Sequence, residues 1–286
     1  MTNISPSFPS IGLALGGGGA RGLAHIGLLD TFLQWGVTPH FVSGTSMGAI
    51  IAAAFAMGIP TAELTSIALK FTKTSEMVKL VDWSPPRRGF LEGKKVQGFL
   101  ESVFGTDTQF EDLKIPLAIN SVDLCTGQEI IFTSGSLITA MMSSIAVPGI
   151  FQPYEVGDYQ LVDGGVLNNV PVSLLAMFKP NLTIAVDVQI NPRRDPHWIN
   201  LPQQPHWPLP LPDVFLEFYR AELIMLYEIT QQKLNAYHPD ILISPNIPVE
   251  ITPFLGFPKA KEIIEIGALS ARENLPDILA LLERIK

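Results

Sequence analysis

Short apolar runs alternate along this chain with longer stretches whose apolar positions have helical spacing. The first run, residues 11–15, is followed by a glycine-rich turn and by a helical stretch over residues 20–35. A second run at residues 40–43 leads through another sharp turn into a helix of small residues that ends near Gly58. Strands that alternate with helices predict an α/β layer fold with a largely parallel sheet.

The same alternation continues to the end of the chain, without an internal repeat. Helical spacing recurs over residues 61–81, 93–104, 136–146, 170–178, 213–237 and 258–285, and strand-like runs lie at residues 115–121, 129–133, 159–162, 182–189 and 240–244. The proline-rich stretch of residues 192–212 interrupts this order, but a strand and two helices still follow it. We therefore predict one domain over residues 1–286, with its core in about residues 11–190.

Composition adds the question of a membrane, because only 16% of the residues are charged while 47% are apolar. This balance excludes a disordered chain. Two windows without charge, residues 41–62 and 130–154, are long enough to cross a bilayer, but glycines, serines and prolines interrupt both. Such windows are typical of buried core helices. No basic region precedes the first apolar run, so we expect a cytoplasmic protein that meets a membrane only peripherally.

Charge and cysteine content limit which ligands and which stabilising sites the protein can have. A net charge of −8 disfavours nucleic acid as a ligand, because binding phosphates requires a basic face. The single cysteine, Cys125, excludes an internal disulfide framework and a cysteine-rich metal site. We expect neither a metal nor a cofactor, and we read no oligomeric state from the sequence.

The glycine-rich turn matches G-x-G-x-x-G at Gly17, Gly19 and Gly22. A dinucleotide site also needs a carboxylate about 20 positions on, and residues 39–43 contain none. A nucleotide-phosphate loop would continue with lysine, where this chain has Leu23. An anion cradle fits better, because glycine amides at a helix N-terminus can stabilise an oxyanion. A tight packing turn would explain one or two of the glycines, but not four in a row.

The second turn has the pattern G-x-S-x-G, with Ser46 between Gly44 and Gly48. A sharp strand-to-helix turn lifts the serine hydroxyl out of the backbone, and glycines on either side relieve crowding. The N–H of the next residue, Met47, would then face the reacting carbonyl. This context predicts a nucleophilic serine.

A serine nucleophile needs a base. Asp163 is the best candidate, because it ends a strand-like run and precedes Gly164 and Gly165; Asp123 and Asp187 compete with it. Three histidines lie late enough for a Ser…Asp…His order, none of them in a convincing motif: His197, His206 and His238. His25, one turn into the first helix, is read as structural.

Taken together, these segments resemble the three signatures of the patatin-like phospholipase family, in the family order. They are the glycine run with Arg21, the elbow around Ser46, and Asp163 with its two glycines; residues 143–153 also resemble a family segment. The resemblance implies a three-layer α/β/α fold, in a short bacterial-type member. It further implies a Ser–Asp dyad, without histidine, that hydrolyses a lipid or lysophospholipid ester.

Carried over position by position, the resemblance implies that Ser46 is the nucleophile and Asp163 its base. The backbone of Gly17, Gly18 and Gly19, with the Met47 N–H, would form the oxyanion hole. Arg21 matches the family's basic position, and it would either act on substrate or order the loop. The remaining motif glycines would support these turns: Gly22, Gly44, Gly48, Gly164 and Gly165.

Three further readings stay open. The proline-rich stretch carries Trp198 and Trp207, which suit an apolar–water boundary, so it is either a lid that touches acyl chain or membrane surface or a packed surface loop. The chain is either an enzyme or a non-catalytic regulatory protein on the same fold. Within the enzyme class, a Ser-His-Asp triad competes with the dyad.

Overall fold

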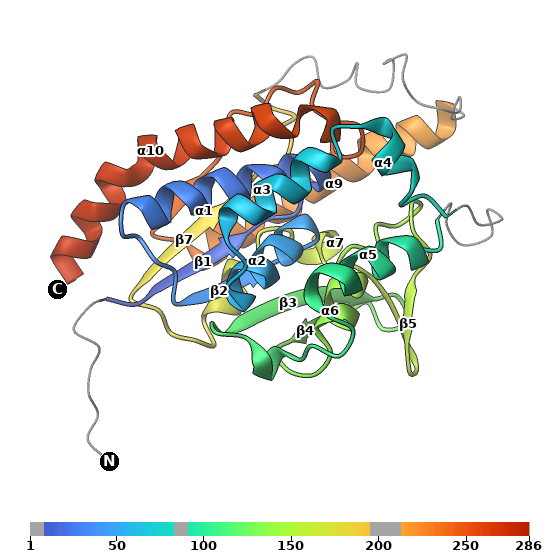
Figure 1. The fold of residues 1–286 in the computed structure, drawn as a ribbon, viewed down its shortest axis with the longest axis horizontal. Coiled ribbons are helices and arrows are strands. Elements are labelled where there is room, and N and C mark those ends of the chain that lie inside the picture. Colours follow the sequence, from blue (N-terminus) through green and yellow to red (C-terminus); the bar gives the residue numbers. More distant parts are fainter. Residues whose placement is uncertain (1–8, 83–90, 195–212, 286) are drawn as a thin grey trace.

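A single sheet forms the centre of the part of the chain that the computed structural model describes, residues 9–82, 91–194 and 213–285 (Figure 1). It has eight strands in the order β5-β6-β3-β2-β1-β7-β8, and β4 pairs with β3 outside this path. The strands are β1 (Ile11–Leu15), β2 (Phe41–Gly44), β3 (Leu117–Asp123), β4 (Glu129–Phe132), β5 (Tyr154–Val156), β6 (Tyr159–Asp163), β7 (Leu182–Val186) and β8 (Ile241–Ile243).

The sheet is mostly parallel, as predicted, with an antiparallel edge. Strands β3, β2, β1, β7 and β8 run parallel to one another. Strands β4 and β6 pair antiparallel with β3, and β5 pairs antiparallel with β6. Short connections explain this edge: β3 returns as β4 through a turn that contains Gly127, in the left-handed region at φ 69°. A connection this short can only join antiparallel strands.

Helices cover both faces of the sheet (Figure 1). On one face α1, α3 and α10 pack together and α2 packs on the strands; on the other face α8 packs on β1, β2 and β7, and α9 packs on α7 and α8. The helices are α1 (Ala24–Gln34), α2 (Met47–Met57), α3 (Thr61–Lys70), α4 (Thr74–Val78), α5 (Lys94–Phe104), α6 (Leu137–Ser144), α7 (Gly165–Asn168), α8 (Val172–Leu175), α9 (Asp213–Tyr237) and α10 (Ala260–Ile285).

Alternation along the central strands divides the core into two. In β1, Ile11, Leu13 and Leu15 join the large cluster under α1, α2 and α10, whereas Ala14 faces the smaller cluster that contains Leu175 of α8. Successive side chains of a strand point to opposite faces, so a strand buried on both sides reads as a continuous apolar run. The two cores make the three-layer α/β/α arrangement that the sequence predicts.

Several predicted boundaries are corrected by the structure. The predicted helix over residues 61–81 is two helices, α3 and α4, because the polar residues after Phe71 offer no apolar face to bury. The helix expected from residue 20 begins with a 3-10 turn, η1 (Gly19–Leu23), and the helix expected over residues 170–178 shortens to α8. Strand β5 was not predicted. Among the described helices, none combines the length and apolarity that crossing a membrane requires.

Candidate active site

Strand β3 brings Ser46 and Asp163 together, although they are far apart in sequence. Gly44, at the end of β2, is paired with Ile119, and Asp163, at the end of β6, is paired with Ser121 two residues further along β3. Ligand sites of α/β sheets lie where parallel strands end. Here β2 ends one strand away from the antiparallel strand β6, which carries Asp163.

The backbone at Ser46 has the conformation of a nucleophile turn. Ser46 has φ 55° and ψ −125°, one of the few positive φ values at a non-glycine residue in the described chain. Strain of this kind persists only where the surroundings enforce it. They do so here: a side chain at Gly44 would come within 2.5 Å of the Gly48 carbonyl oxygen, and one at Gly48 would collide with the Leu15 carbonyl.

Asp163 is buried against the serine. The Gly165 N–H donates to Asp163 Oδ1 at 2.8 Å. Burial raises the pKa of Asp163 to about 6, although interactions with the Ser46 side chain and the Gly165 N–H lower it. The carboxyl is therefore ionised at neutral pH and closer to a useful base than an exposed aspartate is.

The segment that begins at residue 143, which resembles a family segment, hydrogen-bonds to the backbone of both Ser46 and Asp163. Ser144, at the end of α6, accepts a hydrogen bond from the Ser46 N–H at 2.8 Å on its Oγ. The Asp163 N–H donates to the Ala146 carbonyl oxygen at 3.0 Å. One short stretch of chain therefore fixes the backbone at both Ser46 and Asp163.

The glycine loop runs directly beside Ser46, since a Cβ at Gly17 would lie 3.1 Å from Ser46 Cβ. The Gly17 N–H donates to the Asn169 carbonyl oxygen at 3.0 Å, and Asn169 Nδ2 donates back to the Gly17 oxygen at 3.1 Å. Gly17 is thus clamped and offers no free donor. The part-exposed Gly18 and Gly19 have no acceptor for their N–H groups within the described chain, and the same holds for Met47 at the start of α2.

Arg21 orders the loop and does not reach substrate. Its side chain is fully buried. The guanidinium donates to five backbone carbonyls, those of Val188, Gln189, Ile247, Pro248 and Ile251, at 2.7 to 3.3 Å. Gly22 next to it is required for packing, because an added Cβ would lie 2.6 Å from Met47 Cγ. The first of the two roles left open for Arg21 is excluded by this burial.

The other candidate bases that the structure describes have contacts of their own, and none with Ser46 is seen. Asp123 accepts hydrogen bonds from its own turn, Cys125 and Thr126, and from Gln160, and these bonds lower its pKa. Asp187 caps the turn at Gln189, after β7. His238 precedes β8 and so lies at the opposite edge of the sheet; His197 and His206 lie outside the described residues.

His25 is structural, as predicted. Its Nε2 donates to the Gly16 carbonyl oxygen at 2.8 Å, beneath the glycine loop, and the ring is fully buried. Burial lowers its pKa to about 4, so the ring is neutral at pH 7. Its contact with Gly16 supports the loop from below.

Glu222 of α9 is a second carboxyl near Asp163. Its side chain is half-buried. Burial, and to a smaller extent the charge of Asp163, raise the pKa of Glu222 to about 7. The sequence does not reveal Glu222, because the apolar spacing of α9 predicts a helix but not which of its polar residues lies near Asp163. Asn120 and Asn169 were missed because they contact the site through tertiary packing and stand in no motif. Ser144 lies in the segment of residues 143–153 that resembles a family segment, but its contact with Ser46 could not be predicted from that resemblance.

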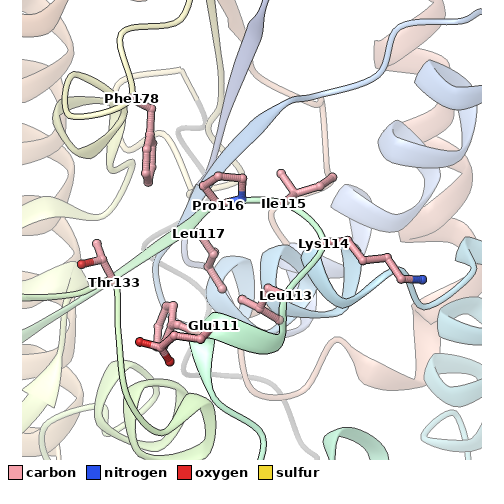
Figure 2. A pocket seen from close by; sticks show the side chains of 9 residues that line it. Glu111, Leu113, Lys114, Ile115, Pro116, Leu117, Thr133 and Phe178 are labelled. Carbon is pink, nitrogen blue, oxygen red and sulfur yellow. The ribbon is translucent and has the colours of Figure 1, made fainter. Parts of the chain in front are cut away.

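A separate pocket of about 350 Å³ lies at the start of β3, around Pro116, Leu117 and Phe178 (Figure 2). Phe178 stacks on Phe41 at the start of β2. The pocket therefore lies where the parallel strands begin, and Ser46 lies where they end. None of the predicted site residues lines it.

The glycine loop does not resemble a dinucleotide site in three dimensions either. In such a site the strand next to the loop ends in the carboxylate that holds the ribose. Here that neighbouring strand is β2, and it ends at Gly44 and runs into Ser46. The space beside the loop is occupied by the serine turn.

Known proteins of related sequence include one named as an esterase and one named as a lysophospholipase. An uncharacterized NTE family protein of Mycobacterium tuberculosis (strain ATCC 25618 / H37Rv) is 37% identical over 180 residues, which are 63% of this chain and 30% of that protein. The neuropathy target esterase sws of Drosophila melanogaster is 33% identical over 63% of this chain and 13% of its own length. Lysophospholipase NTE1 of Meyerozyma guilliermondii is 27% identical over 97% of this chain and 20% of its own length.

The chain therefore corresponds to less than a third of each of these three relatives. Among solved structures, VipD from Legionella pneumophila is similar with a TM-score of 0.50, over 96% of this chain and 67% of that one. At 12% identity this likeness concerns the fold alone. A family model described as patatin-like phospholipase matches residues 13–176, more than half of the chain. With the elbow, the aspartate turn and the glycine loop all inside this range, the chain belongs to the patatin-like phospholipase family.

Proposed function

We propose that this chain is a serine acyl hydrolase that cleaves an ester bond of a lipid. The observation that carries the proposal is the strained turn at Ser46, which the pairing of β2, β3 and β6 brings to the buried carboxyl of Asp163. A strained turn that holds a serine against a base is the arrangement that nucleophilic acyl transfer requires. The names of the relatives support a lipid ester, and a lysophospholipid in particular, as substrate.

In the first half of the reaction Ser46 Oγ attacks the ester carbonyl carbon, and its proton passes to Asp163. The carbonyl oxygen becomes an oxyanion, which the N–H groups of Gly18, Gly19 and Met47 stabilise together with the amino-terminal end of α2. The tetrahedral intermediate then collapses, and the leaving alcohol takes the proton from Asp163. An acyl group remains on Ser46.

In the second half a water molecule repeats these steps. It gives a proton to Asp163 as it attacks the acyl carbon, and the second tetrahedral intermediate releases the carboxylic acid. The proton returns from Asp163 to Ser46 Oγ. The same carboxyl therefore accepts and donates a proton twice, with no histidine.

Hydrolysis of an ester series tests this proposal. Wild type, Ser46→Ala and Asp163→Asn would be assayed on short acyl p-nitrophenyl esters, lysophospholipids and diacyl phospholipids. We expect each variant to lose at least about a thousandfold in kcat, the order seen when a member of a catalytic serine site is removed. Activity that survives both substitutions would falsify the proposal.

Two controls separate the alternatives. A fluorophosphonate probe should label wild type at Ser46 and leave Ser46→Ala unlabelled; a protein that kept the fold without the activity would not be labelled at all. Replacing His197, His206 or His238 by alanine should leave kcat within about twofold, whereas a histidine triad requires one of them to abolish turnover. Residues 195–212 of the proposed lid lie outside the described residues. The lid over residues 192–212 stays a prediction, as does contact with a membrane surface.

A further inference from the structure

Ser46 and Asp163 come from segments that are joined through β3, and one residue of β3 lies between the two joints. Ile119 is paired with Gly44 and Ser121 with Asp163, so Asn120 stands between the register positions of nucleophile and base. The Asn120 side chain is fully buried. A buried amide needs partners for its donors and its acceptor, so its contacts show what it holds.

The amide contacts the neighbour of each dyad member. Its Oδ1 accepts a hydrogen bond from the Thr45 hydroxyl at 2.7 Å, and Thr45 directly precedes Ser46. Its Nδ2 lies 3.3 Å from the carbonyl oxygen of Gly164, which directly follows Asp163. Gly164 is packed so closely that an added Cβ would lie 2.5 Å from Asn120 Oδ1. One planar group therefore spans from the elbow to the aspartate turn.

Further contacts fix the orientation of this amide. Nδ2 lies 2.9 Å from Glu129 Oε1 and 3.0 Å from the Asn168 carbonyl oxygen, and both are acceptors only. Asn168 Nδ2 also donates to Glu129 Oε1, at 2.8 Å, and Lys233 Nζ lies 3.7 Å from the other carboxylate oxygen. A carboxylate held in this way determines which end of the amide is the donor.

We propose that Asn120 is a positioning residue, which holds the Ser46 elbow and the Asp163 turn at the separation that proton transfer needs. This inference rests on the proposed function. It extends that function to a residue outside the three family motifs. A small misplacement of reacting groups can cost about a hundredfold in rate, so a residue that sets their separation should act mainly on kcat.

Exchange of the amide for a carboxylate tests the inference. Asn120→Asp keeps the shape and the acceptor for Thr45, but it removes both N–H donors and opposes the Glu129 carboxylate and the Gly164 carbonyl. We expect kcat to fall about thirtyfold or more, with KM within about threefold. Asn181→Asp is the matched control, because Asn181 is exposed and hydrogen-bonded to Ser10 where β1 and β7 begin, at the end of the sheet away from Ser46. The kcat of this variant should be that of wild type.

Reversal of the pair provides a readout that loss of fold cannot mimic. In the double variant Asn120→Asp with Glu129→Gln, the new glutamine amide can donate to the new carboxylate, so we expect kcat to recover at least about tenfold over Asn120→Asp. Thr45→Val, which loses the hydroxyl, should lower kcat at least about tenfold, while Thr45→Ser keeps it. This second pair decides the question if Asn120→Asp does not fold.

The outcomes distinguish the two proposals. If wild type hydrolyses esters and is labelled at Ser46, yet Asn120→Asp or Thr45→Val turns over at the wild-type kcat, the inference on Asn120 is overturned while the function stands. Absence of recovery in the double variant would also overturn it. If wild type neither hydrolyses any ester nor reacts at Ser46, the proposed function is overturned, and the role of Asn120 with it.

Discussion

Asp163 must be ionised to accept a proton, yet it lies buried under the Ser46 turn. Burial raises its pKa to about 6, while interactions with the Ser46 side chain and the Gly165 N–H oppose that rise. The resulting carboxylate is a stronger base than an exposed aspartate and is still ionised at pH 7. In the proposed mechanism, the environment of this one residue therefore sets the pH range of activity, and it also affects the stability of the fold.

The first prediction is the pH profile of hydrolysis. Because the basic form is required, kcat/KM should be constant above pH 7 and fall about tenfold per pH unit below about pH 6. A p-nitrophenyl ester has no titrating group in this range, so the profile would report the enzyme. A rate that stays constant down to pH 4.5 would contradict Asp163 as the base.

The second prediction concerns stability. Since the pKa of Asp163 is raised above its usual 3.8, the folded state binds this proton more tightly than the unfolded chain, and that advantage is lost as the pH rises through about 6. At pH 7.5 the buried charge costs up to about 3 kcal/mol. Asp163→Asn should raise the free energy of unfolding at pH 7.5 by about 1–3 kcal/mol, and the gain should vanish near pH 4.

Urea unfolding of wild type and Asp163→Asn at both pH values measures this difference. An inactive variant that is less stable than wild type at pH 7.5 would mean that Asp163 contributes more through its hydrogen bonds than it costs through burial.

At the scale of elements, α9 extends the active site beyond the family match. It packs on α7, which begins directly after the Asp163–Gly164 turn, and places Glu222 near Asp163. Its outward face is different in character, with Phe218 67% and Met225 53% exposed. The helix therefore has an inner face, where Glu222 interacts with the charge of Asp163, and an outer face with exposed apolar side chains.

The third prediction follows from the inner face. With a pKa of about 7, Glu222 is still largely protonated where Asp163, with a pKa of about 6, titrates. Glu222→Gln should therefore leave the acid limb of the kcat/KM profile within about 0.3 of a pH unit of wild type, because the carboxyl it replaces is already neutral there. Glu217→Gln is the matched control on the same helix, because Glu217 is exposed and paired with Arg220. An acid limb that moves to lower pH in Glu222→Gln alone would show that Glu222 is ionised before Asp163.

The packing of α1 on α10 is a second property of elements. Gly27 and Gly267 lie where the two helices touch: a side chain at Gly27 would collide with the Ile264 carbonyl, and one at Gly267 with the Ala24 carbonyl. The fourth prediction is that Gly27→Ala lowers the free energy of unfolding by about 1–3 kcal/mol, as overpacking does. Gly98→Ala in α5, where the glycine faces open space, should instead raise it by about 0.5–1 kcal/mol.

Chemical denaturation of both glycine variants measures these changes. If the two substitutions shift the unfolding free energy in the same direction, the close approach of α1 and α10 is not what requires glycine at position 27.

At the scale of the whole molecule, Arg21 ties two distant segments to the glycine loop. Its guanidinium donates to carbonyls after β7 and to the stretch between β8 and α10, so the loop, the sheet end and the last third of the chain meet at one cation. A lysine cannot replace it, since an ammonium lacks the planar fork that reaches several acceptors.

The fifth prediction is that Arg21→Met lowers the free energy of unfolding by at least about 3 kcal/mol, because it leaves several buried carbonyls unpaired. Arg21→Lys should be nearly as destabilising. Arg272→Met, on the exposed side of α10, is the control and should change it by less than about 0.5 kcal/mol. An Arg21→Met protein as stable as this control would leave Arg21 free for another role.

What could be predicted from the sequence is what local spacing controls. The turns at Ser46 and after Asp163 need glycines within two residues, and the central strands β1 and β7 are mostly apolar, so the sequence predicts both turns and both strands from short-range patterns. The division of residues 61–81 into two helices and the strand β5 were missed, because they depend on which surfaces the rest of the chain covers.

The sequence by itself determined the layer architecture and the two residues proposed for the chemistry. Only the tertiary structure decided which amides of the glycine loop are free, that Arg21 is buried, and that Asn120, Ser144 and Glu222 stand around the dyad. The physical reason is range. A turn or a strand is specified by neighbours in sequence, whereas a hydrogen bond such as that between Gly17 and Asn169 forms only once the sheet has brought distant segments together.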